Sequence, residues 1–437
     1  MKFPAPLDPG FQPAILAVRQ HRRQATVPLV IGLEREGGLV SRYETVVNPA
    51  APDAVRYVER LVKFLLWSRG GWRLSLDGPR DLCRQIQVRP FDAELMARVY
   101  ERPFAIIRGE APAAHEAGRS AGGHLDGCRL GFDLGASDYK VAAVKDGAPV
   151  FSAEFPWNPR DQSDPEYHYR QLNDGLRQAA RHLPRVEAIG GSTAGVVVNN
   201  QIMVASLFRT VPADKFAAAK TIFRRLGDEW RVPVEVANDG DVTALAGAMT
   251  LGDHAVLGLA MGSSQAAGFI DGAGHIGGWL NELAFAPVDF HPGAAVDEWS
   301  GDVGVGALSF SQQAVNKLLP AAGIRLPAEM ALPERLQAVQ ALVAGQDARA
   351  AKIYETIGVY LGYTIPWYAE FYDYRHLLVL GRVTTGRGGD ILIAKAREVL
   401  AVEFPDVAAK IAVHVPDEKS RRVGQAVAAA SLPEIPK

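Results

Sequence analysis

Apolar and polar residues alternate along two segments near the start of the chain. Residues 27–35 and 39–47 follow this pattern on either side of Glu36, Gly37 and Gly38, which predicts a β-hairpin. Apolar residues then recur at helical spacing in two segments, and two short apolar runs are typical of strands. The two helices are expected at residues 53–65 and 91–100, and the two strands at residues 72–76 and 104–107. The first part of the chain is therefore predicted to be an α/β unit.

A stretch rich in glycine, alanine and polar residues, 109–127, follows this unit and is the best candidate for a linker. Beyond it the pattern predicts three consecutive strands, a helix and a buried strand, with an Asp146-Gly147 hairpin turn between the second and third strands. These elements are expected at residues 129–134, 139–145, 149–155, 167–183 and 186–190. The order β-β-β-α-β can thus be read from the hydrophobic pattern alone.

The second half of the chain is richer in helical periodicity. Strands are expected at residues 232–237, 255–260, 266–270 and 377–380. Helices are expected at residues 212–226, 242–249, 308–319, 331–344, 348–374, 391–400 and 423–430. A break is expected in the long helix at Pro366, because proline removes a backbone donor.

Composition narrows the functional classes. The 437 residues are 48% hydrophobic and 22% charged, with a net charge of -2, so the chain lacks the overall positive charge of a nucleic-acid-binding protein. Only two cysteines are present, which excludes a disulfide-rich scaffold and a cysteine-rich zinc site. The N-terminus has no apolar signal-peptide core, and no run is long enough to span a membrane. We therefore expect a cytoplasmic protein without a membrane partner.

The first candidate for chemistry is the glycine loop between the strands at 129–134 and 139–145. Its residues Asp133, Gly135, Ser137 and Lys140 are spaced as a grip for nucleotide phosphates, with backbone N–H groups and a hydroxyl turned to the ligand. Asp133, at the end of a strand, is placed to hold Mg²⁺ through water, since this cation prefers oxygen ligands and keeps several waters. A plain hairpin turn is the simpler alternative.

A second loop of the same kind, Gly262-Ser263-Ser264, lies between the strands at 255–260 and 266–270. Between the two loops, a short strand ends in Asn238-Asp239. On its own this pair is explained by a turn after the strand, since Asn-Asp-Gly is good turn chemistry. Trp299 is either part of a lid or, as we slightly prefer, anchored in the core below a surface loop.

Five motifs now stand in one order: DLGASDYK, GGSTAG, ANDGD, MGSSQAAGFIDG and LVLGRVTTG. This set resembles the sugar-kinase branch of the superfamily that holds actin, the heat-shock chaperone ATPases and hexokinase, and is most similar to the bacterial ROK proteins. The resemblance covers about residues 128–434. It implies an α/β, two-lobed, actin-like ATPase fold, of ribonuclease H-like type, around an ATP cleft. The implied domains are an N-terminal α/β extension with linker at 1–127, a first lobe at 128–240 with the C-terminal helix 420–437, and a second lobe at 241–419.

The resemblance also implies roles for individual residues. Asp239 would be the catalytic base, and Asn238, Gly195, Asn281 and Glu282 would line the sugar site. The cofactor-binding residues would be Asp133, Gly135, Ser137, Lys140, Gly262, Ser263, Ser264, Gly381 and Gly386. ROK proteins commonly have a histidine followed by a cysteine-rich zinc loop where this chain has Phe285 and no cysteine, so no zinc site is expected.

Together these observations predict an ATP- and Mg²⁺-dependent kinase that phosphorylates a hydroxyl of a sugar or sugar-like polyol. The main alternative is a non-catalytic carbohydrate sensor or regulator on the same fold. A third reading is a site that binds nucleotide or sugar without transfer. DNA binding is disfavoured, because the first region lacks two consecutive helices with a recognition-helix pattern. The expected partners are a small-molecule sugar and a nucleotide, and a homodimer is left open.

Overall fold

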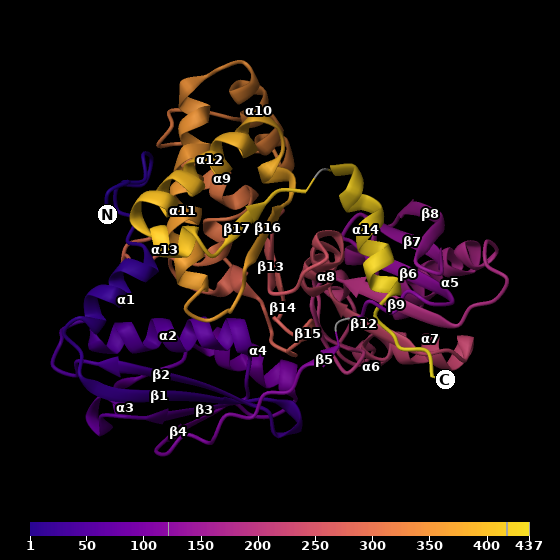
Figure 1. Ribbon diagram of the computed structural model, residues 1–437, viewed down its shortest axis with the longest axis horizontal. Coiled ribbons are helices and arrows are strands. Elements are labelled where there is room, and N and C mark those ends of the chain that lie inside the picture. The colour runs from indigo at the N-terminus through magenta and orange to yellow at the C-terminus, as the bar shows by residue number, and fades with distance from the viewer. Residues whose placement is uncertain (121, 417, 437) are drawn as a thin grey trace. The chain divides into compact units, whose positions relative to one another are not determined.

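The computed structural model describes residues 1–120, 122–416 and 418–436 (Figure 1). Its residues group into two units, each assembled from segments far apart in the sequence. The first unit contains residues 1–117, 259–267 and 279–415, and the second contains residues 118–258, 268–278 and 416–437. The domain limits expected near residues 127 and 240 stay predictions.

The N-terminal part of the first unit is built on a mixed four-stranded sheet of order β2-β1-β3-β4. Its strands are β1 (Val27–Glu34), β2 (Val40–Val47), β3 (Arg73–Asp77) and β4 (Ala105–Arg108). Strand β1 pairs antiparallel with β2 and β3, whereas β3 and β4 are parallel. The predicted hairpin and the α/β character of this region are confirmed. Its helices are α1 (Ala14–Arg22), α2 (Ala54–Arg69), α3 (Arg80–Gln85) and α4 (Pro90–Tyr100).

Helix α2 lies across one face of this sheet (Figure 1). It is buried on nearly every side along its C-terminal half, where Phe64 and Trp67 have no exposed surface. The Phe64 ring lies 4.1 Å from Phe371 and 4.9 Å from Trp367, measured between ring centroids. Because each aromatic side chain buries a large apolar area, these contacts tie the N-terminal region firmly to the helices at the other end of the chain.

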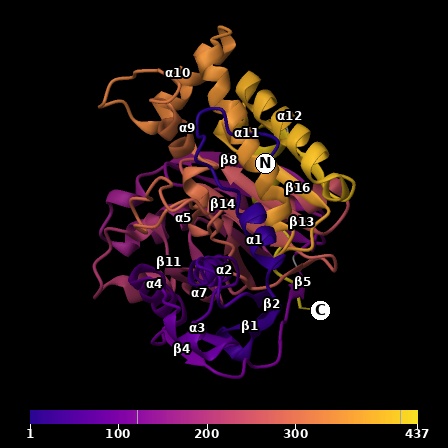
Figure 2. The same cartoon turned by 90° about the vertical axis from the view of Figure 1, so that its left-hand side faces the viewer.

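A second sheet, of order β14-β13-β16-β17, and a group of helices make up most of the rest of the first unit, to which the segment from β13 to β14 contributes residues 259–267. The strands are β13 (Val256–Met261), β14 (Gln265–Ile270), β16 (His376–Leu380) and β17 (Ala412–His414). The helices are α9 (Gln312–Leu318), α10 (Leu332–Ala344), α11 (Ala348–Tyr368), α12 (Gly386–Glu403) and α13 (Pro405–Ala408). Helices α11 and α12 pack along each other (Figure 2).

The prediction of a helical break at Pro366 was wrong. Helix α11 continues through Pro366 and ends at Tyr368, six residues before the expected end. Trp367 and Tyr368 are completely buried, and the Trp367 Nε1 donates a hydrogen bond to the Pro287 carbonyl at 2.9 Å. This packing outweighs the one backbone hydrogen bond that proline removes.

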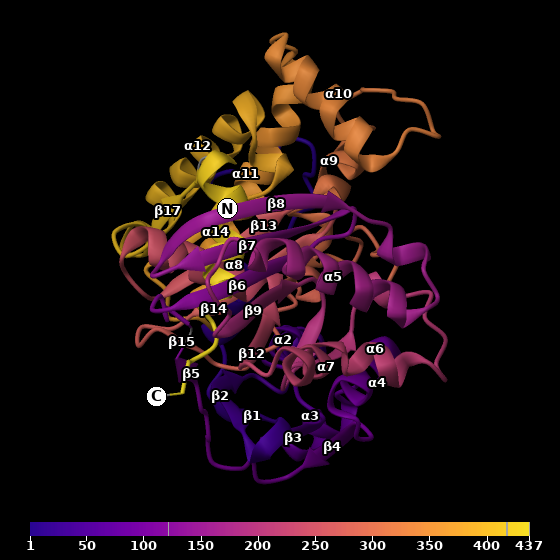
Figure 3. The ribbon, with the colours of Figure 1, turned by 90° about the vertical axis from the view of Figure 1, so that its right-hand side faces the viewer.

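The second unit is built on a five-stranded sheet of order β12-β9-β6-β7-β8, whose strands lie side by side in Figure 3. The strands are β6 (Cys128–Leu134), β7 (Asp138–Lys145), β8 (Ala148–Pro156), β9 (Ala188–Thr193) and β12 (Val234–Asn238). Strands β6, β7 and β8 form an antiparallel meander, and β9 runs parallel to both β6 and β12. With helix α5 (Pro165–Ala180) between β8 and β9, the predicted order β-β-β-α-β is confirmed.

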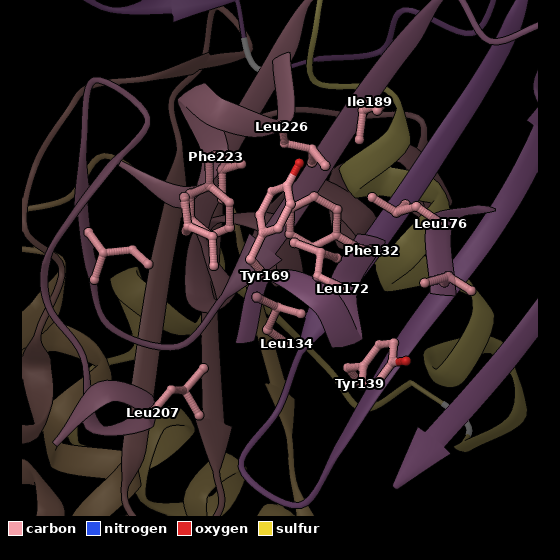
Figure 4. Close-up of a cluster of buried hydrophobic side chains, with 14 of the residues drawn as sticks. Phe132, Leu134, Tyr139, Tyr169, Leu172, Leu176, Ile189, Leu207, Phe223 and Leu226 are labelled. Carbon is pink, nitrogen blue, oxygen red and sulfur yellow. The ribbon is translucent and has the colours of Figure 1, made fainter. Parts of the chain in front are cut away.

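Helices α5, α6 (Phe216–Lys220) and α7 (Ile222–Trp230) cover one face of this sheet. Figure 4 shows the core they form with the sheet, in which Phe132, Leu172 and Phe223 are completely buried. The single helix expected at residues 212–226 is two helices, because the backbone leaves the helical region at Thr221. The Thr221 hydroxyl donates to the Ala217 carbonyl at 3.1 Å, a local bond that competes with the helical pattern.

Helix α14 (Glu418–Ala430) packs on the opposite face so closely that two strand positions must be glycine. A Cβ on Gly131 would lie 1.9 Å from the Ala426 carbonyl oxygen, and one on Gly190 would lie 1.7 Å from the Ala429 oxygen. These glycines therefore allow the close backbone approach that sets the last helix on the sheet.

Short elements complete the description. Helix α8 (Asp239–Leu251) follows β12 directly, β10 (Val196–Val198) pairs with β11 (Gln201–Val204), and β5 (Arg119–Ser120), within the expected linker, pairs with β15 (His275–Ile276). Short 3-10 helices lie at Glu36–Gly38, Pro159–Asp161, Ser206–Phe208, Leu283–Phe285, Gly306–Leu308 and Arg382–Thr384. Among the described residues, no helix combines the length and the apolar character needed to span a membrane.

Candidate functional site

Asp133 lies at the carboxyl end of β6 and is only 7% exposed. Its Oδ1 accepts a hydrogen bond from the Ser192 hydroxyl at 2.8 Å, and its Oδ2 lies 3.7 Å from the Lys140 Nζ. Burial is the main cause that raises the pKa of Asp133, and the nearby Asp138 charge adds to it, while Lys140 and Ser192 oppose the shift. The carboxylate is therefore held in one orientation and still has an oxygen that is not hydrogen-bonded within 3.5 Å.

The loop after Asp133 is held rigidly. The Gly135 N–H donates to the Asp138 carbonyl at 3.0 Å, and the Trp157 Nε1 donates to the Gly135 carbonyl at 2.9 Å. A Cβ at Gly135 would lie 2.8 Å from the Asp138 carbonyl oxygen, so this tight turn favours glycine. The Ser137 hydroxyl donates to the Asp138 carboxylate at 3.0 Å, on an exposed part of the loop.

The carboxylate of Asp138 is close to the expected phosphate grip and would repel an anion if it were unpaired. The Lys140 Nζ lies 3.3 Å from Asp138 Oδ1 and 3.7 Å from Asp133 Oδ2. The Lys140 charge thus offsets both carboxylates. The loop therefore repels a phosphate group less than the presence of Asp138 in the sequence suggests.

Asn238 and Asp239 lie at the end of β12, on the other side of β9 from Asp133. Thr193 of β9 is in register with both Leu134 of β6 and Asn238 of β12. The parallel strands therefore end at one edge of the sheet, where ligands of α/β proteins commonly bind. This places the Asp133 and Asn238-Asp239 motifs, 105 positions apart in the sequence, at one edge of the second unit.

The Asn238 side chain is the N-cap of α8. Its Oδ1 accepts from the Gly240 N–H at 2.7 Å, and its Nδ2 donates to the Gly195 carbonyl at 2.8 Å. Gly195 has a φ of 108°, and a Cβ there would lie 2.5 Å from the Ala205 Cβ. The glycine is thus needed for local packing, and its carbonyl fixes the asparagine.

Asp239 is the first residue of α8 and is partly exposed. Its pKa is raised to about 6, mainly by desolvation and also by the Asp133 charge, although the backbone N–H groups at the helix start oppose this. A general base is most effective when its pKa lies near the working pH. Asp239 therefore has the protonation behaviour of a base in the neutral range.

Three further residues support this edge of the sheet, and sequence reasoning missed them: Ser192, Trp157 and Gln425. The Gln425 Nε2, on α14, lies 3.3 Å from the Ser192 Oγ and 3.4 Å from the Asp239 carbonyl oxygen. Ser192 lies in the glycine-rich GGSTAG motif, which was a usable signal, whereas no local pattern marks Gln425.

The other predicted nucleotide residues lie in the first unit. The Gly262 N–H donates to the Ser264 carbonyl at 2.9 Å, and both Ser263 and Ser264 are exposed at the loop. Gly381 has a φ of 111°, and a Cβ there would lie 2.4 Å from the Met261 carbonyl oxygen. The end of β16 thus approaches the end of β13 so closely that glycine is required.

Gly386 begins α12 with a φ of 64°, and no atom lies within 4 Å of the position of a Cβ there. The preceding turn is held by Gln340, whose Nε2 donates to the Arg382 carbonyl at 2.8 Å. Arg382 is itself exposed. The helix start therefore has open space beside it.

Asn281 and Glu282 are bound to the C-terminal end of α2. The N–H groups of these residues donate to the carbonyls of Ser68 and Trp67 at 3.0 and 2.9 Å. The Asn281 side chain is 4% exposed, and its Oδ1 accepts from the Tyr372 hydroxyl at 3.0 Å. Because the last carbonyls of a helix have no partners within the helix, this segment serves as a cap for α2.

Phe285 packs against aromatic rings of the N-terminal region. Its ring centroid lies 4.4 Å from that of Trp67 and 5.5 Å from that of Phe91. Phe285 therefore makes apolar contacts with α2 and α4.

Trp299 corrects one of our interpretations, since it is 69% exposed and not anchored in the core. The turn that carries it is fixed by Asp297, whose Oδ2 accepts from the Ser300 N–H and hydroxyl at 2.7 Å. The buried anchor of this loop is thus a carboxylate. Across residues 1–120, 122–416 and 418–436, no group of three or more His, Cys, Asp or Glu side chains is placed to hold a metal ion.

Comparison with known proteins finds similarity in structure only. No family model matches the sequence, and no curated protein matches it. A ROK hexokinase from Thermus thermophilus has a TM-score of 0.54 at 18% identity, with 69% of this chain and 97% of that chain covered.

Two further solved structures are similar to the chain. A ROK-family transcriptional regulator, a homologue of the E. coli MLC protein, has a TM-score of 0.57 at 16% identity, with 71% of this chain and 79% of that chain covered. A ROK-family glucokinase from Streptomyces griseus, in complex with glucose and AMPPNP, has a TM-score of 0.51 at 17% identity, with 70% and 99% covered. The chain therefore has the α/β, actin-like fold of the ROK proteins, as its sequence predicts.

Proposed function

We propose that this protein is a ROK-type sugar kinase, which transfers the γ-phosphoryl group of ATP to a hydroxyl of a sugar or sugar-like polyol. The observation that carries the proposal is Asp239, a carboxylate at a strand end whose pKa is raised to about 6 and which lies beside the Asp133 motif. The fold adds support, because similar structures include a hexokinase and a glucokinase that is complexed with glucose and AMPPNP.

In the proposed reaction Asp239 accepts the proton of the sugar hydroxyl as the oxygen attacks the γ-phosphorus. The bond between the γ-phosphorus and the β–γ bridging oxygen breaks, and ADP leaves with the electron pair of that bond. Asn238 would orient the sugar, since its Nδ2 has a second hydrogen beyond the one donated to Gly195. Gly195, Asn281 and Glu282 stay predictions as residues of the sugar site.

The proposed nucleotide contacts come from two loops. Gly135, Ser137 and Lys140 would contact phosphate oxygens, and Asp133 would hold Mg²⁺ through water. The surroundings of Asp133 are compatible with a hydrated Mg²⁺ ion. Its Oδ1 accepts the hydrogen bond of Ser192, whereas its Oδ2 lies 3.7 Å from the Lys140 Nζ and could accept from a water bound to the cation. The cation would neutralise charge on the phosphates when bound.

The remaining nucleotide-binding residues belong to the first unit. Exposed hydroxyls at Ser263 and Ser264, beside Gly262, are suitable donors to phosphate oxygens. Gly381 and the open start of α12 at Gly386 would receive the adenosine. These roles rest on the motif order together with the local geometry of each loop.

The test is ADP release from the purified protein with ATP and Mg²⁺ over a panel of hexoses and N-acetylhexosamines. We expect ADP release that depends on one sugar class and falls by at least about 10²-fold in the Asp239→Asn variant, because general-base catalysis contributes about 10²–10⁴-fold. Asp228→Asn, at an exposed position on α7, is the matched control. Equal rates in the wild type and Asp239→Asn would refute the proposal.

A second candidate is a sugar-binding protein without phosphoryl transfer. It is favoured by Asn281 and Phe285, which are engaged in packing against Tyr372 and Trp67, and by the similarity to a ROK transcriptional regulator. Calorimetric titration with the same sugars distinguishes the two functions. Saturable sugar binding without ADP release would establish the sensor and exclude the kinase.

A further inference from the structure

The N-terminal part of the first unit borders a partly open cavity of about 180 Å³, and no residue that lines it is one of those proposed for phosphoryl transfer. It is located between the β1–β2 hairpin and the C-terminal end of α2. Ile31, Leu33 and Leu65 supply its apolar wall, and Tyr43, Arg69 and Trp279 supply its polar wall. An apolar cavity of about 150 Å³ is enough to bind benzene, so this one has room for a ligand of that size.

The strand register explains why these side chains meet. Ile31 is opposite Tyr43, and Leu33 is opposite Ser41, so their side chains project from the same face of the hairpin toward α2. Arg69 lies one helical turn beyond Leu65 on α2. The cavity thus has an apolar end and a charged end.

The Arg69 guanidinium is the unusual feature of the charged end. The residue is 8% exposed, and its Nη2 donates to the Phe371 carbonyl, but its Nη1 has no hydrogen-bond partner among the described residues. The cation lies 3.2 Å from the Trp279 ring centroid and 4.9 Å from that of Tyr372. Burial lowers its pKa to about 10. A buried cation without a hydrogen-bonded anion is costly, and a bound anion would offset that cost.

The carboxylate of Glu116, also on the wall, is already engaged by other donors. It accepts from the Ser41 hydroxyl at 2.5 Å, from the Trp279 Nε1 at 3.1 Å and from the Arg35 guanidinium. Among the described residues these donors do not include Arg69, and the Glu116 charge would disfavour a ligand with two negative charges.

Tyr43 offers a second donor to a ligand. Its oxygen accepts from the Arg22 guanidinium, which leaves the phenolic hydrogen available, and burial raises the pKa of Tyr43 to about 12, so the group stays protonated at neutral pH. We propose that this cavity binds a small organic monocarboxylate, whose carboxylate pairs with Arg69 and whose apolar body lies against Ile31, Leu33 and Leu65. The site shares no residue with the proposed kinase centre, so its test does not depend on that function.

The test is calorimetric titration of the full-length protein with benzoate and with 3-methylbutanoate. Benzamide and benzyl alcohol are uncharged controls of similar size, and inorganic phosphate tests the preference for one negative charge. We expect saturable binding of at least one carboxylate, at least about tenfold tighter than that of either uncharged control or phosphate, as for loss of one charge-assisted contact. Equal binding of benzoate and benzamide, tighter binding of phosphate, or no saturable binding of either carboxylate would overturn the proposal.

Variants locate the site. Arg69→Met removes the cation and Leu65→Phe fills the apolar end, and each should weaken carboxylate binding by at least about tenfold. Tyr43→Phe removes only a hydroxyl group and should weaken carboxylate binding as well. Arg102→Met is the matched control, because Arg102 also lies over a tryptophan ring, that of Trp72, but is exposed and outside the cavity. If Arg69→Met does not fold, Leu65→Phe and Tyr43→Phe decide the matter. Carboxylate binding that is unchanged in these two variants would refute the assignment.

Discussion

Replacing Asp239 by asparagine should make the protein more stable at neutral pH while it lowers the proposed phosphoryl transfer by about 10²–10⁴-fold. The carboxylate lies at the start of α8, and desolvation together with the Asp133 charge raises its pKa from 3.8 to about 6. Because the folded state binds this proton more tightly than the unfolded state, stability falls as the pH rises from about 4 to about 6 and is constant above that range. Asparagine has nearly the same shape and carries no charge.

The size of the effect follows from the shift. A change of about two pKa units corresponds to about 3 kcal/mol, since one unit is about 1.4 kcal/mol. Two factors reduce this value: Asp239 retains some solvent exposure, and the asparagine loses the favourable interaction of a negative charge with a helix N-terminus. We therefore expect the free energy of unfolding of Asp239→Asn to exceed that of the wild type by about 1–3 kcal/mol at pH 7.5. At pH 4 the folded carboxyl group is already protonated, and the gain should nearly vanish.

Urea unfolding at pH 7.5 and pH 4, followed by tryptophan fluorescence, measures both values for the wild type and Asp239→Asn. Asp228→Asn, an exposed substitution on α7, should leave stability unchanged at either pH. A loss of stability at pH 7.5 in Asp239→Asn would refute the reasoning, because it would mean that the charged carboxylate stabilises the fold. In the wild type, kinase activity should fall as the pH drops through about 6, since Asp239 must be deprotonated to act as a base.

Three further substitutions test separate features. Gly190→Ala should destabilise the protein by about 3 kcal/mol or more in urea unfolding, because its Cβ would overlap the backbone of α14. Gly424→Ala should not destabilise the protein, because Gly424 lies on α14 itself and no atom is within 4 Å of its Cβ position. Asp302→Ala should cost about 3 kcal/mol, because the buried Arg60 loses its carboxylate partner whereas the buried Lys63 keeps Asp92 at 3.0 Å, and a loss below about 1 kcal/mol would contradict this. Lys140→Met should raise the pKa of the Asp133 carboxyl group, because the Lys140 charge opposes the upward shift caused by burial, and NMR titration of that carboxyl group measures the change; an unchanged pKa would argue against the coupling.

The sequence predicts those parts of the fold whose information is local. The hairpin at β1–β2, the meander β6–β7–β8 and the glycine loop after Asp133 follow from alternation and turn residues, and all three are present. Asp133 and Asp239 reach one edge of the sheet because parallel strands place their carboxyl ends together, and the motif order indicated this.

The parts that could not be predicted depend on contacts between distant segments. Gly131 and Gly190 look like ordinary strand glycines in the sequence, yet both are needed because α14, which begins more than 220 positions later, packs onto the backbone. Gln425 on that helix supports Ser192 for the same reason. At Thr221 a local side-chain bond accompanies the division of a segment whose periodicity predicts a single helix. At Pro366 tertiary packing keeps α11 continuous, although proline predicts a break.

The segment at 281–285 gives the N-terminal region a structural part in the proposed site. Asn281 and Glu282 donate their N–H groups to the end of α2, and Phe285 packs on Trp67, so an element outside the ROK resemblance fixes the backbone at positions that the resemblance assigns to sugar binding. A histidine at position 285 would be placed among Trp67 and Phe91, where burial disfavours its charged form. Hydrogen bonds to the last carbonyls of α2 and the contact of Phe285 with Trp67 therefore hold this segment in place.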